Sequence, residues 1–325
     1  MLCYRHTETD PAFNLATEEY LLNQADDDCF MLWRNHNAII VGRNQNTLSE
    51  INPAFVDRHG IQVVRRITGG GAVYHDLGNV NFTFIKVNGE GLDIDFVTYT
   101  RPILDYLNRL SVPARLDGRN DLTVNGLKIS GNAQHIHKSH VLHHGTLLFD
   151  VDLEMLAAVL LVDPEKYTDK AVQSIRNRVT NIRDHLPASV GIEQFMEDLT
   201  AHIQSAHGAR PAVLSAADRS AINHLADTKY RRWEWNFGSS PDYNFRKSTR
   251  TPGGTVDIRL DVEEGTIRSI RIFGDYFGTD DIGEIEKRLT GCRHHRRSLQ
   301  NRLDGIALGK YIRDVTVDQL LDAMF

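Results

Sequence analysis

The spacing of apolar residues near the start of the chain predicts an amphipathic helix. Asp10 followed by Pro11 is typical of a helix start, because the Asp carboxylate accepts free backbone amides and Pro needs no amide partner there. Apolar residues then recur at helical spacing to about residue 26. Glu19 lies on the same apolar stripe. It therefore either reaches water at the edge of the stripe or has a buried partner.

The next part of the chain reads as short strands interleaved with helices. Runs of β-forming residues predict three strands, at residues 29–34, 38–42 and 61–66. Alternation over residues 80–87 predicts a half-buried strand with Phe82 and Phe84 on one face. Helical spacing returns at residues 97–109, 153–161 and 191–207. Because there is no regular strand–helix–strand rhythm, the pattern predicts an α+β fold with a mixed, largely antiparallel sheet flanked by helices.

A polar, proline-containing stretch at residues 239–254 is the best candidate for a linker. We therefore predict two domains, residues 1–245 and residues 246–325. The second begins with a hairpin pattern and continues with amphipathic helical runs, at residues 282–289, 297–303 and 317–324. This pattern predicts a small α+β domain.

Composition and charge exclude several classes of protein. The chain has 325 residues and a net charge of −6, which disfavours sequence-independent binding to nucleic-acid phosphates. No stretch reaches the roughly 20 apolar residues of a membrane span, and the N-terminal segment lacks a signal-peptide core, so we expect a cytoplasmic protein with no membrane association. The cysteines Cys3, Cys29 and Cys292 are too scattered for a disulfide framework and read as reduced thiols.

The densest unusual segment is RRITGGGAVYHDLGN, residues 65–79. Three consecutive glycines allow the backbone to approach a ligand closely and to point successive amides at an anion, while Arg66 supplies a fixed positive charge. The spacing matches neither a P-loop nor a dinucleotide-binding fingerprint. Alone, the segment is compatible with a phosphate cradle or with a flexible hairpin loop.

A second polar segment contains a hairpin signal at Asn125-Gly126. A two-residue loop there pairs Val124 with Leu127 and Thr123 with Lys128, and continuing outward it predicts pairs of Leu122 with Ile129 and of Asp121 with Ser130. Asp121 and Lys128 then become diagonal neighbours on one face. This face is either a ligand site or the wet side of an ordinary hairpin.

Taken together, these segments resemble the lipoate-protein ligase family. The resemblance rests on the run at residues 65–79, followed in order by GRND at 118–121, KISG at 128–131, HHGTLL at 143–148 and SIRNRVTN at 174–181. It extends back to FNLA at 13–16 with Glu18 and Glu19, and covers most of residues 11–238. The resemblance implies the fold of biotin ligases and of the class II aminoacyl-tRNA synthetase core, with a small C-terminal domain linked to adenylation.

The resemblance also implies roles for individual residues. Lys128 would be catalytic, contacting both the lipoyl carbonyl and the α-phosphate, and Asp121 would lie in the ribose and Mg²⁺ region. The implied lipoate site consists of Glu19, Arg66, Thr68, Gly70, Lys128 and His144. The implied ATP and lipoyl-AMP site consists of Arg66, Gly71, Ala72, Val73, Tyr74, Asn79, Asn120, Asp121 and Lys128.

The implied activity is ATP-dependent activation of lipoate to lipoyl-AMP and transfer of the lipoyl group to an acceptor lysine. Implied cofactors are ATP and Mg²⁺, and implied acceptors are apo lipoyl domains of 2-oxoacid dehydrogenase E2 subunits and the glycine-cleavage H protein. Two alternatives remain: an octanoyl or lipoyl transferase with a cysteine nucleophile, and a non-catalytic lipoyl-binding module. The absence of cysteine between Cys29 and Cys292 disfavours the first, and the presence of Lys128 and Asp121 disfavours the second. The choice between lipoate and octanoate stays open.

Overall fold

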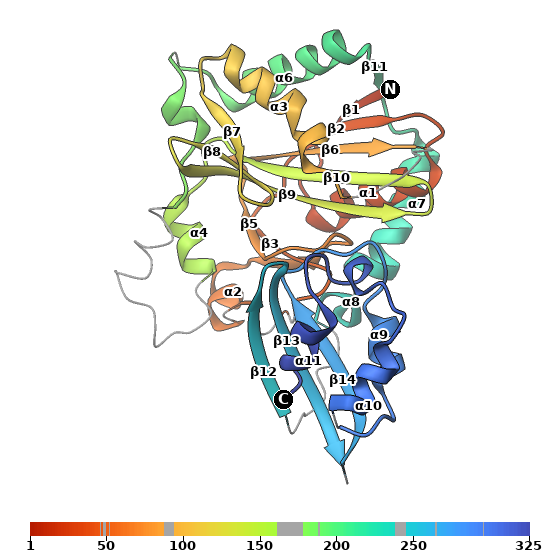
Figure 1. The fold of residues 1–325 in the computed structure, drawn as a ribbon. Coiled ribbons are helices and arrows are strands. Elements are labelled where there is room, and N and C mark those ends of the chain that lie inside the picture. Colours follow the sequence, from red (N-terminus) through yellow and green to blue (C-terminus); the bar gives the residue numbers. More distant parts are fainter. Residues whose placement is uncertain are drawn as a thin grey trace.

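The computed structural model describes residues 1–45, 47, 50–51, 53–87, 94–160, 178–187, 189–237, 245–263, 265–294 and 296–325. Within these residues, eight strands form one sheet in the order β11-β1-β2-β6-β10-β9-β8-β7 (Figure 1). Their bounds are β1 Leu2–Arg5, β2 Cys29–Trp33, β6 Asn79–Lys86, β7 Ala114–Asp117, β8 Asp121–Val124, β9 Leu127–His137, β10 His140–Leu148 and β11 Arg210–Ala212. Strand β1 runs parallel to β11 and β2, and the other neighbours are antiparallel. The predicted mixed, largely antiparallel sheet is confirmed.

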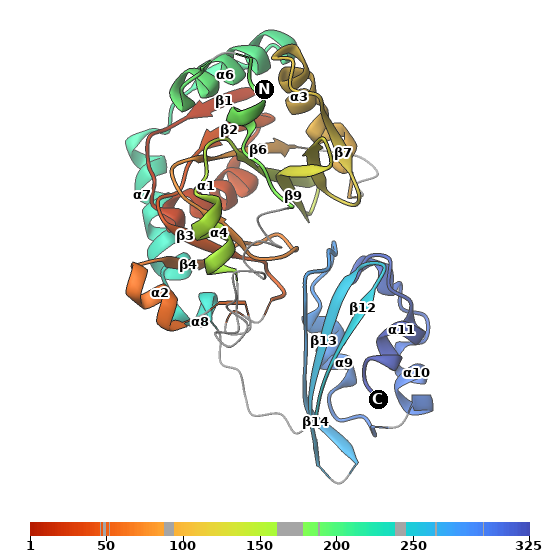
Figure 2. The same cartoon turned by 90° about the vertical axis from the view of Figure 1, so that its left-hand side faces the viewer.

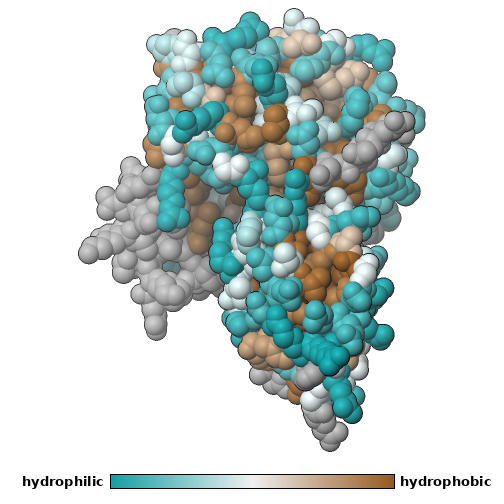
Figure 3. All heavy atoms as spheres, in the orientation of Figure 1, coloured by the Kyte–Doolittle hydropathy of each residue, from teal (hydrophilic) through white to brown (hydrophobic). Residues whose placement is uncertain are grey.

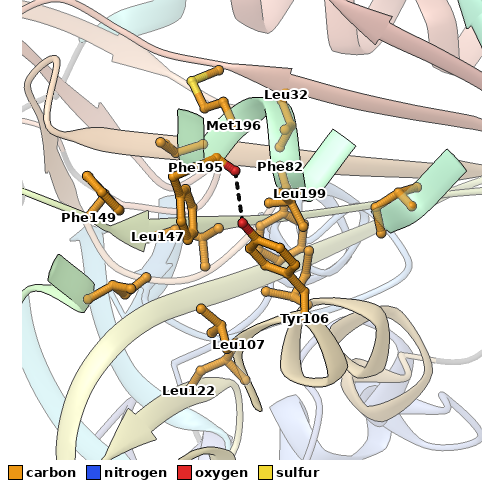
Figure 4. Close-up of a cluster of buried hydrophobic side chains, with 14 of the residues drawn as sticks. Leu32, Phe82, Tyr106, Leu107, Leu122, Leu147, Phe149, Phe195, Met196 and Leu199 are labelled. Atoms are coloured by element: carbon orange, nitrogen blue, oxygen red, sulfur yellow. Dashed lines mark hydrogen bonds between the residues drawn. The ribbon is translucent and has the colours of Figure 1, made fainter. Parts of the chain in front are cut away.

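Helices α3 (Phe96–Arg109) and α6 (Ile192–His207) cover one face of this sheet. Their apolar stripes supply Leu107, Leu199 and other side chains to a shared core (Figure 4). The hydroxyl of Tyr106 in α3 donates a hydrogen bond of 3.2 Å to the backbone carbonyl of Phe195 in α6. This bond satisfies the one polar group that Tyr106 brings into the core.

The other face packs against helix α1 (Pro11–Gln24), helix α7 (Ala216–Leu225) and a small sheet. The small sheet has the order β4-β3-β5, with β3 at Ala38–Val41, β4 at Gln62–Arg65 and β5 at Val73–His75. Shorter elements complete the domain: α2 Pro53–His59, α4 Leu153–Val159, η3 Ile182–His185, η4 Ala226–Tyr230 and α8 Trp233–Asn236.

Strand β6 corrects one prediction. We predicted a half-buried strand at residues 80–87, but β6 is buried on both faces, and Asn81 and Thr83 are only 2% and 1% exposed. The reason is its central position in the sheet, with α3 and α6 on one side and α1 with the small sheet on the other. Its polar side chains therefore need partners inside the protein or in a ligand.

The C-terminal residues form a second sheet with its own core (Figure 2). Its strands, in the order β12-β13-β14, are β12 Phe245–Thr251, β13 Gly254–Glu263 and β14 Thr266–Gly274. They pack with α9 Gly283–Leu289, α10 Arg296–Leu303, η5 Leu308–Lys310 and α11 Val317–Asp322. On the face drawn in Figure 3, apolar residues gather in small patches on both parts of the molecule, among hydrophilic ones. No described helix is both long and apolar enough to cross a membrane.

The predicted linker at residues 239–254 is largely wrong where the structure describes it. Residues 245–251 form strand β12, which pairs with β13 from Phe245↔Leu260 to Thr251↔Gly254. The polar sequence is explained by exposure, since most side chains of β12 reach the surface of this edge strand. The first part of the proposed linker lies outside the described residues. The predicted boundary at residue 245 coincides with the first residue of β12 and stays a prediction.

Candidate functional site

Two neighbouring cavities lie between the small sheet and the large sheet. Lys128 lies on the wall of both. The first has a volume of about 120 Å³ and the second a volume of about 520 Å³. Ala72, Val73 and Thr146 are also shared between the two walls. The first cavity is lined by Leu15, Trp33, Ile40, Arg66, Gly70, Gly71, Ala72, Val73, His75, Asn81, Asn120, Lys128, Gly131, Asn132, Ala133, His144, Gly145 and Thr146. Most of the exposed wall surface is apolar, and several polar side chains interrupt it, as is typical of a site for a small organic molecule.

The glycine loop at residues 69–71 is shaped by the Arg66 side chain. The Arg66 guanidinium donates to the carbonyls of Gly69 at 2.6 Å and Gly71 at 2.9 Å, and to the carbonyl of Ile40 at 3.0 Å. Gly70 has φ +93°, and a Cβ there would lie 2.9 Å from Arg66 Nη2. Only glycine meets both requirements. Thus the sequence GGG holds a tight loop around a buried cation.

Arg66 keeps its charge available for an anion. Its side chain is 5% exposed, and burial lowers its pKa to about 10, so it stays protonated at neutral pH. Among the described residues, no carboxylate lies within ion-pair distance of its guanidinium. Its neutral hydrogen-bond acceptors leave a net positive charge at the wall of the first cavity.

A chain of hydrogen bonds connects Arg66 to a buried carboxylate. Arg66 Nε donates to Thr68 Oγ1 at 2.9 Å, and Thr68 Oγ1 contacts His144 Nε2 at 2.8 Å. His144 Nδ1 lies 2.9 Å and 3.0 Å from the two carboxylate oxygens of Glu18. Because Thr68 Oγ1 accepts from Arg66, its hydroxyl donates to His144 Nε2, and His144 donates its Nδ1–H to Glu18. The chain fixes Thr68 and the His144 ring relative to Arg66.

Replacing Glu18 tests this chain. Glu18 is 1% exposed and also accepts a hydrogen bond of 2.6 Å from Thr83 Oγ1. We expect Glu18→Leu to lower the free energy of unfolding by about 2–4 kcal/mol, because two buried donors lose their acceptor, and Glu18→Gln to cost about 1 kcal/mol, because an amide oxygen still accepts. Urea unfolding measures both. Equal stabilities of the two variants would show that the carboxylate is not the shared acceptor.

Lys128 and Asp121 form an ion pair of 2.8 Å at the junction of the cavities, with both side chains 37% exposed. The predicted pairs Val124↔Leu127 and Thr123↔Lys128 are confirmed, but the outward register is wrong. Leu122 pairs with Ser130 and Asp121 with Gly131, because a bulge shifts the register between Leu122 and Thr123. The register shift places Gly131 opposite Asp121. A Cβ at Gly131 would lie 3.1 Å from Lys128 Nζ, so this glycine leaves room for the ammonium.

The backbone of Lys128 is held by the segment at residues 178–180. Its N–H donates to the carbonyl of Arg178 at 2.8 Å, and its carbonyl accepts from the N–H of Thr180 at 3.0 Å. Asn181 then bonds to the backbone of Val151 in both directions. The second half of the motif at 174–181 therefore positions the lysine, and residues 174–177 lie outside the described residues.

Most of the predicted site residues border one of the two cavities, and three do not. Thr68 is held beside the first cavity by its hydrogen bonds with Arg66 and His144. Glu19 lies apart from the cavity walls, and its carboxylate accepts from Lys229 at 2.8 Å and from the Tyr230 hydroxyl at 2.5 Å. The neighbouring Glu18 enters the site instead. Asn79 is fully buried, and its Nδ2 donates to Asn81 Oδ1 at 3.0 Å, while Asn79 itself is on neither wall. The second cavity is lined in part by Tyr74 and Asp121, and Asn120 borders the first.

Several residues on the wall of the first cavity were not predicted. Trp33, Ile40, Asn81 and Asn132 come from four strands and meet through pairing between distant parts of the chain. Asn81 carried no separate signal, because in a strand predicted to be half-buried it lies with Thr83 on the face opposite Phe82 and Phe84, where polar residues are ordinary.

The buried cysteine thiols have little support as nucleophiles in this geometry. Cys29 is 1% exposed in β2, and burial raises the pKa of its thiol to about 12, so it is not a thiolate at neutral pH. Cys29 and Cys3 both lie outside the lining of the two cavities. Among the described residues, no group of three His, Cys, Asp or Glu side chains is gathered to hold a metal ion by protein ligands alone.

The C-terminal domain contacts the outside of the glycine loop. Gly70 N–H donates to the carbonyl of Tyr276 at 3.4 Å, and a Cβ at Gly69 would lie 2.5 Å from that oxygen. Phe277 is 1% exposed and packs with Phe96 at 5.4 Å between ring centroids. Arg119, next to Asn120, stacks on Phe277 at 4.6 Å and donates to the carbonyls of Gly253 and Asp275. The second domain thus contacts the glycine loop and Arg119, which lies next to the cavity-lining Asn120.

This arrangement is that of an enzyme that joins a carboxylic acid to a nucleotide: a smaller and a larger cavity meet at one lysine, beside a buried arginine. Comparison with known proteins agrees. Residues 10–204 match the lipoyl protein ligase A/B catalytic domain, and residues 240–324 match the bacterial lipoate protein ligase C-terminus. The chain belongs to the lipoate-protein ligase family.

Relatives and solved structures extend the comparison over the full chain. Lipoate-protein ligase LplJ of Bacillus subtilis is 41% identical over 322 residues, covering 97% of each chain. The lipoate complex of LipL1 from P. falciparum superposes with a TM-score of 0.79 at 26% identity, covering 99% of this chain and 97% of that one. A lipoate-protein ligase A bound with ATP has a TM-score of 0.62 at 27% identity, covering 73% of this chain and 99% of the other.

Proposed function

We propose that the first cavity binds lipoate, that the second binds ATP, and that Lys128 joins the two reacting groups. The observation that carries this proposal is the position of Lys128 on both walls. The similar proteins named above include one with lipoate bound and one with ATP bound. Arg66, Gly70, Thr68 and His144 then belong to the lipoate side, and Tyr74, Asn120 and Asp121 to the nucleotide side.

The first step forms a mixed anhydride. A lipoate carboxylate oxygen attacks the α-phosphorus of ATP, the bond from that phosphorus to the bridging oxygen breaks, and pyrophosphate leaves. Both reactants are anions, so the transition state needs positive charge at the point where they meet. Lys128 supplies it from the junction of the cavities, and the buried Arg66 adds a second positive charge nearby.

Mg²⁺ fits the nucleotide side through Asp121 and Asp117. Both carboxylates lie on the wall of the second cavity. Mg²⁺ is usually held by one or two carboxylates together with substrate phosphates, so a protein-only cluster is not required. When bound, the ion would neutralise phosphate charge. Asp121 then has two roles, since it also orients Lys128.

In the second step an acceptor lysine amine attacks the lipoyl carbonyl, an amide bond forms, and AMP leaves. Lys128 stabilises the negative charge that develops on the carbonyl oxygen. No covalent intermediate with the enzyme is involved. The proposed acceptors are apo lipoyl domains of E2 subunits or H protein, and we propose a cytoplasmic location, consistent with the free thiols Cys3, Cys29 and Cys292.

Purified protein incubated with lipoate, ATP and Mg²⁺ tests the function directly. We expect mass spectrometry to detect lipoyl-AMP, and a lipoyl mass increase on an added apo lipoyl domain. Formation of lipoylated acceptor only from a lipoylated donor protein, without ATP, would favour the transferase class instead.

Removing all three thiols separates these classes further. We expect the combined Cys3→Ala, Cys29→Ala and Cys292→Ala variant to keep at least about half of the wild-type transfer rate, because no thiol has a chemical role here. Alanine suits the two buried positions better than serine, which would bury an extra hydroxyl. Loss of transfer in a variant with a normal unfolding transition would contradict an adenylate mechanism.

A further inference from the structure

Two N–H donors on the wall of the first cavity lack acceptors among the described residues. They are His75 Nε2 and Asn81 Nδ2, in side chains that are 3% and 2% exposed. Both residues line the cavity. A buried donor without an acceptor is costly, so such groups usually meet a ligand or an ordered water.

The hydrogen-bond network assigns these atoms as donors. Asn14 Nδ2 donates to the carbonyl of Arg34 and to Asn35 Oδ1, both at 2.9 Å, so Asn35 turns its Nδ2 toward His75 Nδ1, at 3.0 Å. His75 Nδ1 is therefore an acceptor, and the ring hydrogen is on Nε2. Burial lowers the pKa of His75 to about 3, which keeps the ring neutral.

The amide of Asn81 is oriented by a single contact with Asn79. Its Oδ1 accepts from Asn79 Nδ2 at 3.0 Å, so its own Nδ2 carries two hydrogens. No acceptor for that nitrogen is present in the described part of the chain.

Strand register gives the position of Asn81 along the cavity. Asp121 pairs with Gly131, Gly131 N–H bonds to Thr146 Oγ1 across the next pair of strands, Thr146 pairs with Asn81, and Asn81 pairs with Trp33. These residues form one row across β8, β9, β10, β6 and β2. Neighbouring strands lie about 4.8 Å apart, and Asn81 in β6 is two strands away from β9. Asn81 is therefore roughly 10 Å from the β9 end of the row, where Lys128 borders the cavity.

His75 lies at the same far end. Its Nδ1 is 3.0 Å from Asn35 Nδ2, and Asn35 follows two residues after Trp33, which pairs with Asn81 between β2 and β6. His75 itself is in β5 and borders the first cavity. The roof and the floor of the cavity therefore each place one free donor at the end remote from Lys128.

This distance matches the length of lipoate. Five carbon–carbon bonds separate the carboxyl carbon from the ring, and an extended chain advances roughly 1.3 Å per bond, so the dithiolane ring begins about 6–7 Å from the carboxyl group and ends a few Å beyond it. With the carboxylate at Lys128, the ring reaches β6. Its two sulfur atoms are weak hydrogen-bond acceptors, whereas the end of a plain alkyl chain has none.

We infer that Asn81 and His75 form the recognition site for the dithiolane ring, each presenting an N–H to a ring sulfur. The two residues thereby select a sulfur-containing ring over an alkyl chain or a carbocycle of the same shape. The inference rests on the proposed position of the carboxylate at Lys128. It makes the choice between lipoate and octanoate a property of two polar groups at the end of the pocket remote from Lys128.

Competition between acids tests the inference. Wild-type protein is given ATP, Mg²⁺ and equal concentrations of lipoate and 5-cyclopentylpentanoate, in which the ring keeps its size but has no sulfur, and the two acyl-AMP products are measured by mass spectrometry. We expect lipoate to be favoured about tenfold, the effect of two weak hydrogen bonds. A ratio within twofold of one would overturn the inference.

Variants identify the residues responsible. Asn81→Leu and His75→Phe nearly keep the side-chain shape, and each removes the free donor together with the acceptor that faces Asn79 or Asn35. We expect each to reduce the preference about threefold or more. Ile85→Val, buried in the same strand as Asn81 but on neither cavity wall, is the matched control and should leave the ratio unchanged. Because a competition ratio does not depend on the amount of active protein, partial misfolding does not affect it. An unchanged ratio in both donor variants would also refute the inference.

The same experiment separates this inference from the proposed function. If wild-type protein forms no acyl-AMP from either acid, the proposed adenylation is wrong, and the inference about the dithiolane site is refuted as well. If both adenylates form equally, adenylation stands and only the dithiolane site is refuted.

Discussion

Replacing Lys128 with alanine is expected to lower the rate of lipoyl-AMP formation by about 10²–10³ while leaving the fold intact. The loss follows from the position of the side chain, because among the described residues Lys128 is the one charged residue on both cavity walls, where the proposed carboxylate and α-phosphate meet. The fold should tolerate the change because the ammonium is 37% exposed and its ion pair with Asp121 is of the kind that contributes little to stability. Adenylate formation in single turnover gives the rate, and thermal unfolding gives the stability.

A matched control is available in Lys86. It forms an ion pair of 2.7 Å with Asp28, and its ammonium lies away from both cavities. We expect Lys86→Ala to resemble Lys128→Ala in its small effect on stability and to retain normal adenylation. Near-wild-type turnover of Lys128→Ala would mean that Lys128, although it borders both cavities, does not act on the two reactants.

The local sequence pattern was enough to predict most helices and strands. It was less able to predict which of their faces are buried. The helix from Pro11, the hairpin at Asn125-Gly126 and most strands follow from spacing and turn chemistry over a few residues. Strand β6 was predicted as half-buried because alternation describes one strand at a time. Which faces are covered depends on helices far away in the sequence.

The local pattern also failed to predict the bulge beside Leu122 and the strand at Phe245–Thr251. A bulge leaves no mark on the hydrophobic pattern of a short hairpin, so the predicted pair of Asp121 with Ser130 was one residue out. Strand β12 is polar because it is an edge strand, and polar edge strands resemble linkers in sequence.

For the site, contiguous motifs predicted the residues that touch the two cavities near Lys128, and non-contiguous contacts decided the rest. Glu18 and Glu19 are adjacent on one helix turn, and the apolar stripe alone does not say which carboxylate meets His144 and which meets Lys229. Asn81 and His75 acquire their importance only when pairing across strands leaves their donors without acceptors in the described structure. The role of Glu18 and the free donors of Asn81 and His75 can therefore be recognised only from the tertiary structure.

A chain ending at residue 237, before β12, is expected to form lipoyl-AMP at least about 100-fold more slowly than the full chain, and yet to transfer the lipoyl group from supplied lipoyl-AMP. The physical reason lies in the contacts of the second domain with the rim of the cavities. Tyr276 holds the Gly70 amide, and Gly253 and Asp275 hold Arg119, one residue from Asn120. Without these contacts the glycine loop and the segment at residues 119–121 lose their fixed positions, and misplacement of about 1 Å is enough for a loss of this size. Adenylation is more sensitive than transfer, because it must align two anions while excluding water, whereas transfer begins from an anhydride that is already formed.

Both half-reactions can be measured on one preparation, adenylation by mass spectrometry of lipoyl-AMP and transfer by the mass increase of an apo lipoyl domain. A full-length Phe277→Ala variant is the companion measurement, since it removes the ring between Phe96 and Arg119 while keeping the second domain. We expect it to show a smaller loss, about tenfold, in adenylation alone. Undiminished adenylation by the truncated chain would show that the second domain is dispensable for the first step. Loss of both half-reactions, in a truncated chain that still unfolds cooperatively, would instead show that the second domain also shapes the site from which the lipoyl group is transferred.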